Sequence, residues 1–258
     1  MATNSISFDR AANYYDQTRH LSEPMATQGL QLILDRAGPR AKILEVGAGT
    51  GRIGVPLLQH GADWIGCDLS IEMMSKLRAK IPAARLARVN AAQLPFVSDR
   101  FDAVITIHVL HLVGPWRAAL REIKRVLKPG GVYLNNGNWH DETAPSRRLR
   151  NYWRERITAH GAYWQRPGLQ SQEELAAELR SLGATLETTE VARWHTRSTP
   201  REEIDSLASR QYSESWNIPD DVFGTTLDEL REWAAHEYGD LDQLFDEERR
   251  LIFDAIRF

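Results

Sequence analysis

Cysteine is almost absent from this chain: Cys67 is the single one among 258 residues. No intramolecular disulfide can therefore form, and no zinc site can be built from cysteines. The chain has no run of about 18 apolar residues, so we expect no membrane span. The opening MATNSISFDRAANYYD lacks a basic start followed by an apolar stretch, which argues against a secretory signal. These absences predict a protein of the reduced cytoplasm.

Excess positive charge is also missing. Lysine and arginine total 32 against 35 acidic residues, so the net charge is -3. A nucleic-acid partner would normally require a basic face, and we do not expect one here. No acidic pair or histidine–carboxylate cluster stands where a catalytic metal would be held, so no metal is expected. The length is sufficient for one large α/β domain with its own core.

Short apolar segments alternate with helix-compatible segments in the first half of the chain. This alternation is typical of βαβ units and predicts a parallel sheet. The fully apolar AVITI fits a strand that is buried on both faces. The strands expected from this pattern cover residues 41–46, 62–68, 84–89, 101–110 and 131–136.

Beyond residue 137 the pattern changes to longer helices, and six of the eight tryptophans lie there. Ser171 with Glu174, and Thr199 with Glu202, have the spacing of helix-capping boxes. Helices are expected at about 146–161, 171–183, 199–216 and 220–238, and strands at 185–196 and 249–258. The aromatic content suggests that this half encloses a ligand.

The stretch ILEVGAGTGRIG, residues 43–54, is a strand followed by a glycine-rich loop. It reads as G-x-G-x-G from Gly47 and as G-x-G-x-x-G from Gly49. In the dinucleotide-binding pattern, the first glycine directly follows the strand. The strand is expected to end at Val46, and the sixth position counted from Gly47 is Arg52 rather than glycine. This register disfavours a dinucleotide.

Two carboxylates accompany the loop. Glu45 lies inside the apolar strand, where an unpaired carboxylate is costly. It either caps nearby backbone N–H groups or faces a cationic group of a ligand, such as a free α-amino group. Asp68 follows the second strand, 21 residues after Gly47. A carboxylate at that place accepts hydrogen bonds from two ribose hydroxyls, in dinucleotides and in adenosyl ligands alike.

Five motifs now stand in order: ILEVGAGTG, GCDLS, NAAQLPF, FDAVI and LKPGG. Together they resemble the class I S-adenosylmethionine (SAM) dependent methyltransferases, in particular the small-molecule enzymes of the ubiquinone/menaquinone-biosynthesis type. The resemblance covers about residues 8–136. It implies an α/β, doubly wound, Rossmann-like fold with a seven-stranded, mostly parallel sheet. The one antiparallel strand would be the C-terminal segment. The implied cofactor is SAM, with S-adenosylhomocysteine (SAH) as product.

The resemblance also implies a set of cofactor-binding residues. The glycines would pass under the methionine part of SAM, Asp68 would bind the ribose, and Leu69 and Met73 would border the adenine. Asn90 stands where the family usually has aspartate, and its amide oxygen can still accept from an amino group. The full set is Tyr15, Arg19, Glu45, Gly47, Ala48, Gly49, Gly51, Asp68, Leu69, Met73, Asn90, Ala91 and His108.

The N-terminal FDRAANYYDQTR resembles a family segment, F-D-x-x-A-x-x-Y-D-x-x-R, that folds over SAM. Tyr15 and Arg19 would then contact the cofactor from above. The alternative is an amphipathic helix that packs on the domain and leaves Arg19 solvated. Residues 1–30 are accordingly expected to form a lid.

Methyl transfer from a sulfonium is an in-line displacement, so alignment of the reactants carries much of the catalysis. A base is needed only if the acceptor loses a proton. His108 and His111 are the candidate catalytic residues, because open parallel sheets bind ligands at the carboxyl ends of their strands. The alternative is that either histidine only shapes the pocket.

Aromatic and histidine residues of the second half are candidates for binding the substrate, although they equally suit ordinary helix packing. With His111, the candidates are His140, Tyr152, Trp153 and Trp164. The segment SRRLRNYWRER also carries five arginines. It is either a clamp for an acidic substrate or, more commonly, a solvated helix face.

The sequence thus predicts one methyltransferase domain over residues 1–258, with helical cap insertions at about 137–170 and 199–240. The expected function is SAM-dependent methylation of a small molecule on oxygen, nitrogen or carbon. One alternative is a SAM-binding protein without methyl transfer, either a sensor or an enzyme with other SAM chemistry. A nicotinamide-dependent dehydrogenase is the next alternative.

Overall fold

The computed structural model describes residues 5–19, 21–137, 139, 141–163 and 166–258. Two compact units make up the chain. Unit 1 is formed by Met1–Asn138, Arg166–Ala192 and Leu251–Phe258, and unit 2 by Trp139–Gln165 and Arg193–Arg250. After its first passage through unit 2, the chain enters that unit again within one long strand, β6 (Thr185–Ser198), and leaves it within another, β7 (Phe245–Arg257).

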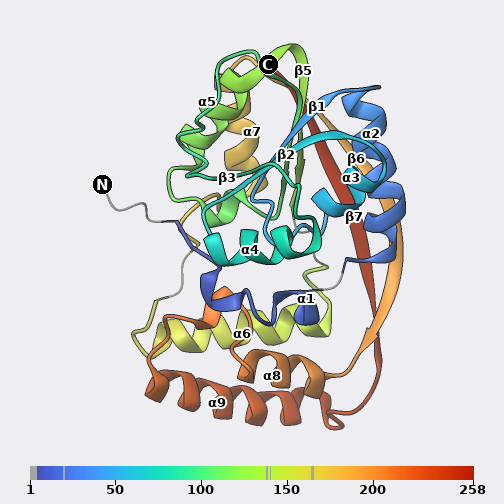
Figure 1. The fold of residues 1–258 in the computed structure, drawn as a ribbon. Helices are drawn as coiled ribbons and strands as arrows, with labels where there is room; N and C mark the ends of the chain where they lie inside the picture. The colour runs from blue at the N-terminus through green and yellow to red at the C-terminus, as the bar shows by residue number, and fades with distance from the viewer. Residues whose placement is uncertain (1–4, 20, 138, 140, 164–165) are drawn as a thin grey trace. The chain divides into compact units, whose positions relative to one another are not determined.

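The sheet has seven strands in the order β3-β2-β1-β4-β5-β7-β6 (Figure 1). The strands from β3 to β5 pair in parallel, and β7 pairs antiparallel with β5. This confirms the predicted doubly wound fold and its antiparallel C-terminal strand. The five parallel strands are β1 (Lys42–Val46), β2 (Asp63–Asp68), β3 (Leu86–Arg88), β4 (Phe101–Ile107) and β5 (Leu127–Asn136).

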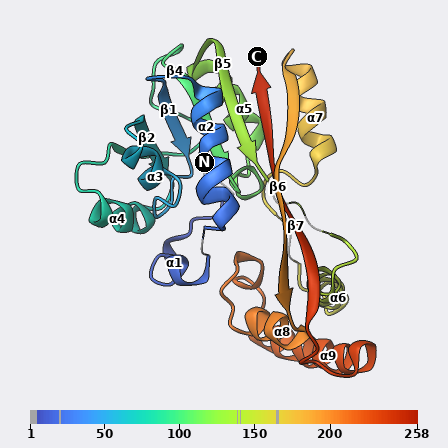
Figure 2. The ribbon, with the colours of Figure 1, turned by 90° about the vertical axis from the view of Figure 1, so that its right-hand side faces the viewer.

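Helices of unit 1 cover both faces of its strands: α2 and α3 lie on one side, and α5 and α7 on the other (Figures 1 and 2). Apolar residues of α5 recur at helical spacing, as in Leu120 and Ile123, and pack with β4 and β5 in one buried cluster. The helices are α1 (Tyr15–Thr18), α2 (Leu30–Ala37), α3 (Gly54–Gln59), α4 (Ile71–Lys80), α5 (Trp116–Val126) and α7 (Gln172–Ser181).

Unit 2 has a core of its own between three helices, α6 (Pro145–Ala159), α8 (Pro200–Ala208) and α9 (Asp220–Tyr238). Helix α8 begins at the predicted capping box, in which Thr199 and Glu202 each bond the other's backbone N–H. Helix α9 has the bounds that the sequence predicted.

The boundaries of β4 and β5 differ from the sequence-based expectation. Strand β4 ends at Ile107 rather than residue 110, because His108 adopts a φ of +56° and a short 3-10 turn, η3 (Leu110–Leu112), follows. Strand β5 begins at Leu127 rather than residue 131, and the register against β4 shifts there. Within the described residues, no helix combines the length and the apolar character needed to cross a membrane.

Candidate functional site

The glycine loop leaves β1 with a backbone that side chains tolerate poorly. Gly47, Gly49 and Gly51 have φ angles of +81°, +55° and +86°. At Gly47 a Cβ would also stand 2.4 Å from Cγ2 of Val109, so glycine is required there on both grounds. The loop is anchored to β2, because the Gly47 N–H donates to the Cys67 carbonyl at 2.8 Å.

Asp68 ends β2 and is fixed against this loop. One carboxylate oxygen accepts from the Gly49 N–H and the other from the Ser70 N–H, both at 2.8 Å. Burial raises the pKa of Asp68, and these backbone hydrogen bonds oppose the shift. A carboxylate has about four acceptor sites, so each oxygen can still accept a hydroxyl. The carboxylate therefore stands at the loop with acceptor capacity for a diol.

The residues expected around an adenine lie on the loops and helix next to Asp68. Met73, in α4, is 3% exposed, and its Cε is 3.4 Å from the position of a Cβ on Gly49. Leu69 directly follows Asp68. Asn90 comes two residues after the β2–β3 pairing ends, and its Oδ1 accepts from the Ala92 N–H at 3.1 Å. Ala91 packs against the buried cluster of α5.

Glu45 is 2% exposed. The partner of its Oε2 is the indole Nε1 of Trp64, at 3.0 Å, rather than a backbone N–H group. Burial raises the pKa of Glu45 to about 8, and the negative charge of the nearby Asp68 also raises it. The hydrogen bond from Trp64 and the positive charge of Arg52 act in the opposite direction and lower this pKa. Sequence reasoning missed Trp64. The available signal was the pairing of β1 with β2, which aligns Glu45 with Gly66, two residues beyond Trp64.

The N-terminal segment is tied to the glycine loop by a three-residue contact. Asp16 accepts from the Thr50 hydroxyl at 2.5 Å and pairs with the Lys80 ammonium at 2.6 Å. Lys80 also donates to the Thr50 carbonyl at 2.8 Å. A second tie joins Asp9 to the Ser70 hydroxyl, beside Asp68. The segment predicted as a lid is thus hydrogen-bonded to the loop and to the residues after β2.

Tyr15 and Arg19 belong to this segment. The guanidinium carbon of Arg19 is 5.0 Å from the Tyr15 ring centroid, and that of Arg52 is 5.3 Å from it. Arg52 also donates to the Arg19 carbonyl at 3.0 Å. The tyrosine ring is therefore within cation–π distance of two guanidinium groups, which aromatic faces attract. The helical structure of this segment consists of a 3-10 turn, η1 (Asp9–Ala11), and the 4 residues of α1.

The two candidate catalytic histidines flank the end of β4. His108 has its positive φ directly after the strand, and its N–H donates to the Asn136 carbonyl at 2.9 Å. His111 lies in η3, and its backbone carbonyl accepts a hydrogen bond from the Gly168 N–H at 3.1 Å. Burial, together with the charge of Arg166, lowers the pKa of His111 to about 4. His111 is therefore uncharged at neutral pH.

The expected substrate residues of the second half lie in the packing of unit 2. Tyr152 stacks on Trp233 with ring centroids 4.4 Å apart. Trp153 is fully buried, and its indole donates to the Thr226 hydroxyl at 3.1 Å. Within this unit Trp153 serves helix packing. His140 and Trp164 lie outside the described residues.

The five arginines of α6 all pair with carboxylates of unit 2. Their partners lie in other segments: Arg147 pairs with Glu142, Arg148 with Glu237, Arg150 with Glu203 and Glu214, Arg154 with Glu214, and Arg156 with Glu229. Glu214 is 5% exposed, so the expectation of a solvated arginine face is wrong for its partners Arg150 and Arg154. A clamp for an acidic substrate finds no support, because these cations already have carboxylate partners.

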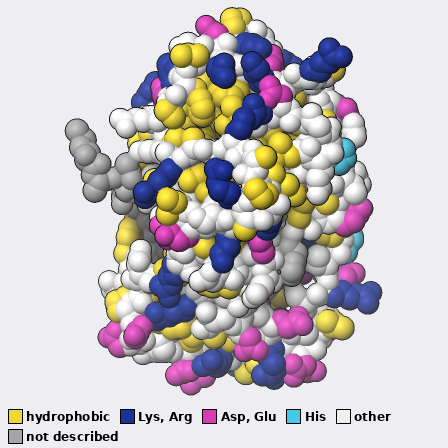
Figure 3. Space-filling view, viewed as in Figure 1, with side chains coloured by type: hydrophobic (Ala, Val, Ile, Leu, Met, Phe, Trp, Pro, Cys, Tyr) yellow, Lys and Arg dark blue, Asp and Glu magenta, His cyan; other side chains and the backbone are white. Residues whose placement is uncertain are grey.

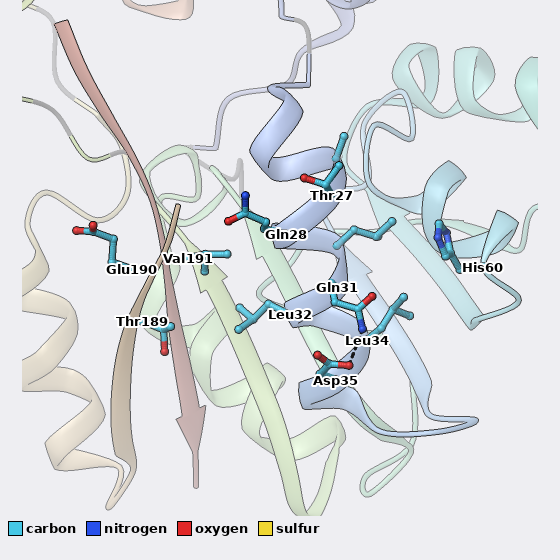
Figure 4. Close-up of a pocket in the computed structure, with 12 residues that line it drawn as sticks. Thr27, Gln28, Gln31, Leu32, Leu34, Asp35, His60, Thr189, Glu190 and Val191 are labelled. Atoms are coloured by element: carbon cyan, nitrogen blue, oxygen red, sulfur yellow. Dashed lines mark hydrogen bonds between the residues drawn. The ribbon is translucent and has the colours of Figure 1, made fainter. Parts of the chain in front are cut away.

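A pocket of about 720 Å³ lies elsewhere on unit 1, between α2, β6 and the end of α3 (Figure 4). Gln31 and Asp35 of α2 line it and bond one another at 2.7 Å, opposite Glu190 and Val191 of β6. No residue of the glycine loop lines it, so it is separate from the candidate site. Among the described residues, no group of three histidines, cysteines or acids could hold a metal ion.

The sheet order and the acid-flanked glycine loop define an α/β protein of the class I methyltransferase type. Residues 44–135 match the family model of a methyltransferase domain. The uncharacterized methyltransferase Rv3342 of Mycobacterium tuberculosis is 31% identical over 231 residues, which are 90% of this chain and 86% of that relative. The chain belongs to the SAM-dependent methyltransferase family, and it is an enzyme of that family.

Two further similarities cover a smaller share of the other protein. A demethylmenaquinone methyltransferase of Beutenbergia cavernae is 35% identical over 127 residues, which are 48% of this chain and 53% of that enzyme. Phosphoethanolamine N-methyltransferase 2 of Haemonchus contortus, solved in complex with SAM, superposes with a TM-score of 0.55 at 18% identity. That superposition covers 96% of this chain and 57% of the solved chain, and it shows a shared fold.

Proposed function

We propose that this chain binds SAM at the glycine loop of residues 47–51 and methylates a small molecule. The observation that carries the proposal is the position of the Asp68 carboxylate. It accepts a hydrogen bond from the Gly49 N–H of the loop at 2.8 Å, and the buried Glu45 lies nearby. One acid suits a ribose diol and the other suits an ammonium group. SAM has both groups and no phosphate.

The chain's own residues fit such a ligand in shape as well as charge. The positive φ angles of Gly47, Gly49 and Gly51 shape the loop, and the lack of side chains at these positions, with the small Ala48 between the first two, suits close approach of the methionine part. Met73 and Leu69 suit one side of an adenine, with Asn90 and Ala91 at its edge. Tyr15 and Arg19 belong to the segment tied over the loop by Asp16, Thr50 and Lys80.

When bound, SAM supplies a methyl group on a positively charged sulfur. The protein's part is to orient the acceptor and exclude water, and the ties of the N-terminal segment serve that exclusion. We propose His108 as the residue that takes a proton from the acceptor where one is lost, because backbone strain of this kind is concentrated at functional sites. A pKa of about 4 makes His111 a weak base, so we assign it a hydrogen-bonding role.

A small molecule is the acceptor that the side chains favour. Basic and acidic side chains occur together over the face drawn in Figure 3, which does not suit a nucleic acid. The arginine-rich α6 has its charges matched internally. We further propose that unit 2, which contains most of the two segments predicted as a cap, influences the choice of acceptor. A cytoplasmic location is part of this proposal.

The test is calorimetric titration with SAM, SAH and NADH in parallel, on the wild type and on Asp68→Ala. We expect the adenosyl ligands to bind, NADH to remain silent, and Asp68→Ala to lose roughly 1 to 3 kcal/mol of affinity. Asp63→Ala is the matched control, because Asp63 starts the same strand and pairs with Arg85. Unchanged affinity in Asp68→Ala would contradict the ribose role, and NADH binding would contradict the whole assignment.

Product analysis by mass then separates methyl transfer from the alternatives. A methylated acceptor with one SAH per turnover is expected. Binding of SAM without any product across an acceptor screen would favour a sensor, and a product without an added methyl group would favour other SAM chemistry.

A further inference from the structure

Trp64 occupies a slot whose two walls are glycines. The indole is fully buried in β2. A Cβ at Gly54, where α3 begins, would stand 2.3 Å from Cζ2 of the indole, and a Cβ at Gly66 would stand 2.3 Å from Cη2. Any other residue at either position would displace the ring. Helix α3 and strand β2 therefore hold this ring in one place.

The slot directs the indole N–H at the carboxyl group of Glu45. Nε1 of Trp64 is 3.0 Å from Oε2 of Glu45. Glu45 is 2% exposed and has Gly66 on one neighbouring strand and Ile105 on the other. A buried acid beside the glycine loop thus meets a donor that is polar but uncharged.

The charges around Glu45 do not favour its ionised form. Asp68, on β2, adds a second carboxylate nearby, and the Cys67 thiol is buried beside them. Arg52, after the loop, is a cation that acts in the opposite direction. Burial dominates this balance and raises the pKa of Glu45 to about 8. At pH 7 the carboxyl group of the ligand-free protein is mostly protonated.

We propose that Trp64 is a positioning residue that fixes the carboxyl group of Glu45, that burial keeps this group a neutral carboxylic acid in the ligand-free protein, and that binding of an ammonium-bearing cofactor releases its proton. The inference rests on the proposed function. The O–H bond of the Glu45 carboxyl group breaks, the proton passes to solvent buffer, and the ligand's ammonium balances the carboxylate that remains. An added cation near the acid favours its charged form.

Proton release has two measurable consequences. Affinity for SAH must rise with pH below about 8, by up to tenfold per pH unit for one released proton. The apparent binding enthalpy must also depend on the buffer, because the buffer takes up the proton. Neither consequence follows if Glu45 is already ionised or never meets the ligand.

The first experiment is calorimetry with SAH at pH 7 in phosphate and in Tris, whose ionisation enthalpies differ. We expect the wild type to release about one proton and Glu45→Gln to release close to none. 5′-Methylthioadenosine, which lacks the ammonium group, is the control ligand and should release none from the wild type. Equal release from wild type and Glu45→Gln would place the proton on a group other than Glu45 and overturn the proposal. SAH binding without release would overturn it too, whereas absence of SAH binding would overturn the proposed function instead.

The second experiment tests Trp64 through Trp64→Phe, which keeps a ring in the slot and removes the N–H donor. Loss of that hydrogen bond should raise the pKa of Glu45, so the pH profile of SAH affinity should shift to higher pH. Trp116→Phe is the matched control, since Trp116 is a buried tryptophan of α5. SAH affinity that falls by the same factor at every pH would show a merely structural role for Trp64. SAH affinity that equals that of the wild type at every pH would overturn the positioning role.

Discussion

At the scale of single residues, the candidate site depends on two residues that adopt a positive φ directly after a strand ends. Gly47 turns with a positive φ after β1, and His108 does the same after β4. Histidine is among the few residues other than glycine that visit this region. Both turns occur at the carboxyl ends of adjacent parallel strands, where side chains leave the sheet. The chemistry proposed for His108 thus follows from where its strand stops.

His111 gives a prediction for acid stability. Its pKa is lowered from 6.5 to about 4, so the unfolded chain binds a proton between these values that the folded chain does not. Stability that is present above pH 6.5 is therefore lost as the pH falls toward 4. Between pH 7 and pH 5 this residue should account for about 2 kcal/mol of lost stability.

Urea unfolding of His111→Gln at both pH values measures this loss. The variant cannot take up the proton, so its stability should fall less than that of the wild type. His60→Gln, at an exposed position, should behave as the wild type does. An identical fall in wild type and His111→Gln would show that His111 is accessible to protons in the folded chain.

Sequence reasoning reached those site residues that follow the ends of apolar strands. Gly47 and Asp68 could be placed from spacing alone, because strand order fixes which loops meet at one edge. Trp64 could not, since its contact with Glu45 depends on how a ring lies between Gly54 and Gly66. A hydrogen bond across two strands leaves no periodic signal in the chain.

At the scale of elements, α6 shows what a charge pattern alone does not determine. Its five arginines suggested a solvated face or a substrate clamp, because their spacing was visible and their partners were not. Two of the partners, Glu214 and Glu229, lie about 60 to 75 residues further along the chain. Arg150 and Arg154 converge on Glu214 and enclose it. The helix is bound to its own unit by these charges.

Glu214→Gln should therefore destabilise unit 2. It would leave Arg150 and Arg154, whose side chains are 19% and 21% exposed, without their shared carboxylate. We expect a loss of about 3 kcal/mol in the free energy of unfolding, measured by urea denaturation. The matched control is Glu142→Gln, which breaks the pair with Arg147 at a carboxylate that is 64% exposed. That change should cost less than about 1 kcal/mol, and equal losses would contradict the role of Glu214.

At the scale of the whole molecule, the alternation of strands and helices predicted a parallel sheet, and the family resemblance implied its antiparallel last strand. Neither predicted that β6 and β7 each belong to both units. The sequence pattern indicated strands at 185–196 and 249–258, whereas the structure extends them to Thr185–Ser198 and Phe245–Arg257. The additional residues of β7 carry charges, as in Glu247, which pairs with Arg249 within unit 2, and these charges obscure the apolar alternation.

This division predicts where cofactor binding stabilises the chain. The residues proposed to bind the cofactor all lie in unit 1. A ligand at 100 times its dissociation constant stabilises the state that binds it by about 2.7 kcal/mol. Compact units with separate cores often open separately, so this stabilisation should be felt mainly in unit 1.

Amide hydrogen exchange with and without saturating SAH tests this expectation. Exchange should slow in β1, in β2 and in the N-terminal segment tied to Thr50, and change little in α9 of unit 2. Asp68→Ala at the same SAH concentration is the control, and the slowing in unit 1 should shrink with its weaker binding. Equal slowing in α9 would mean that the two units open as one. The strands β6 and β7 would then transmit cofactor binding to the helices proposed to influence acceptor choice, and variants of those helices should alter SAH affinity as well.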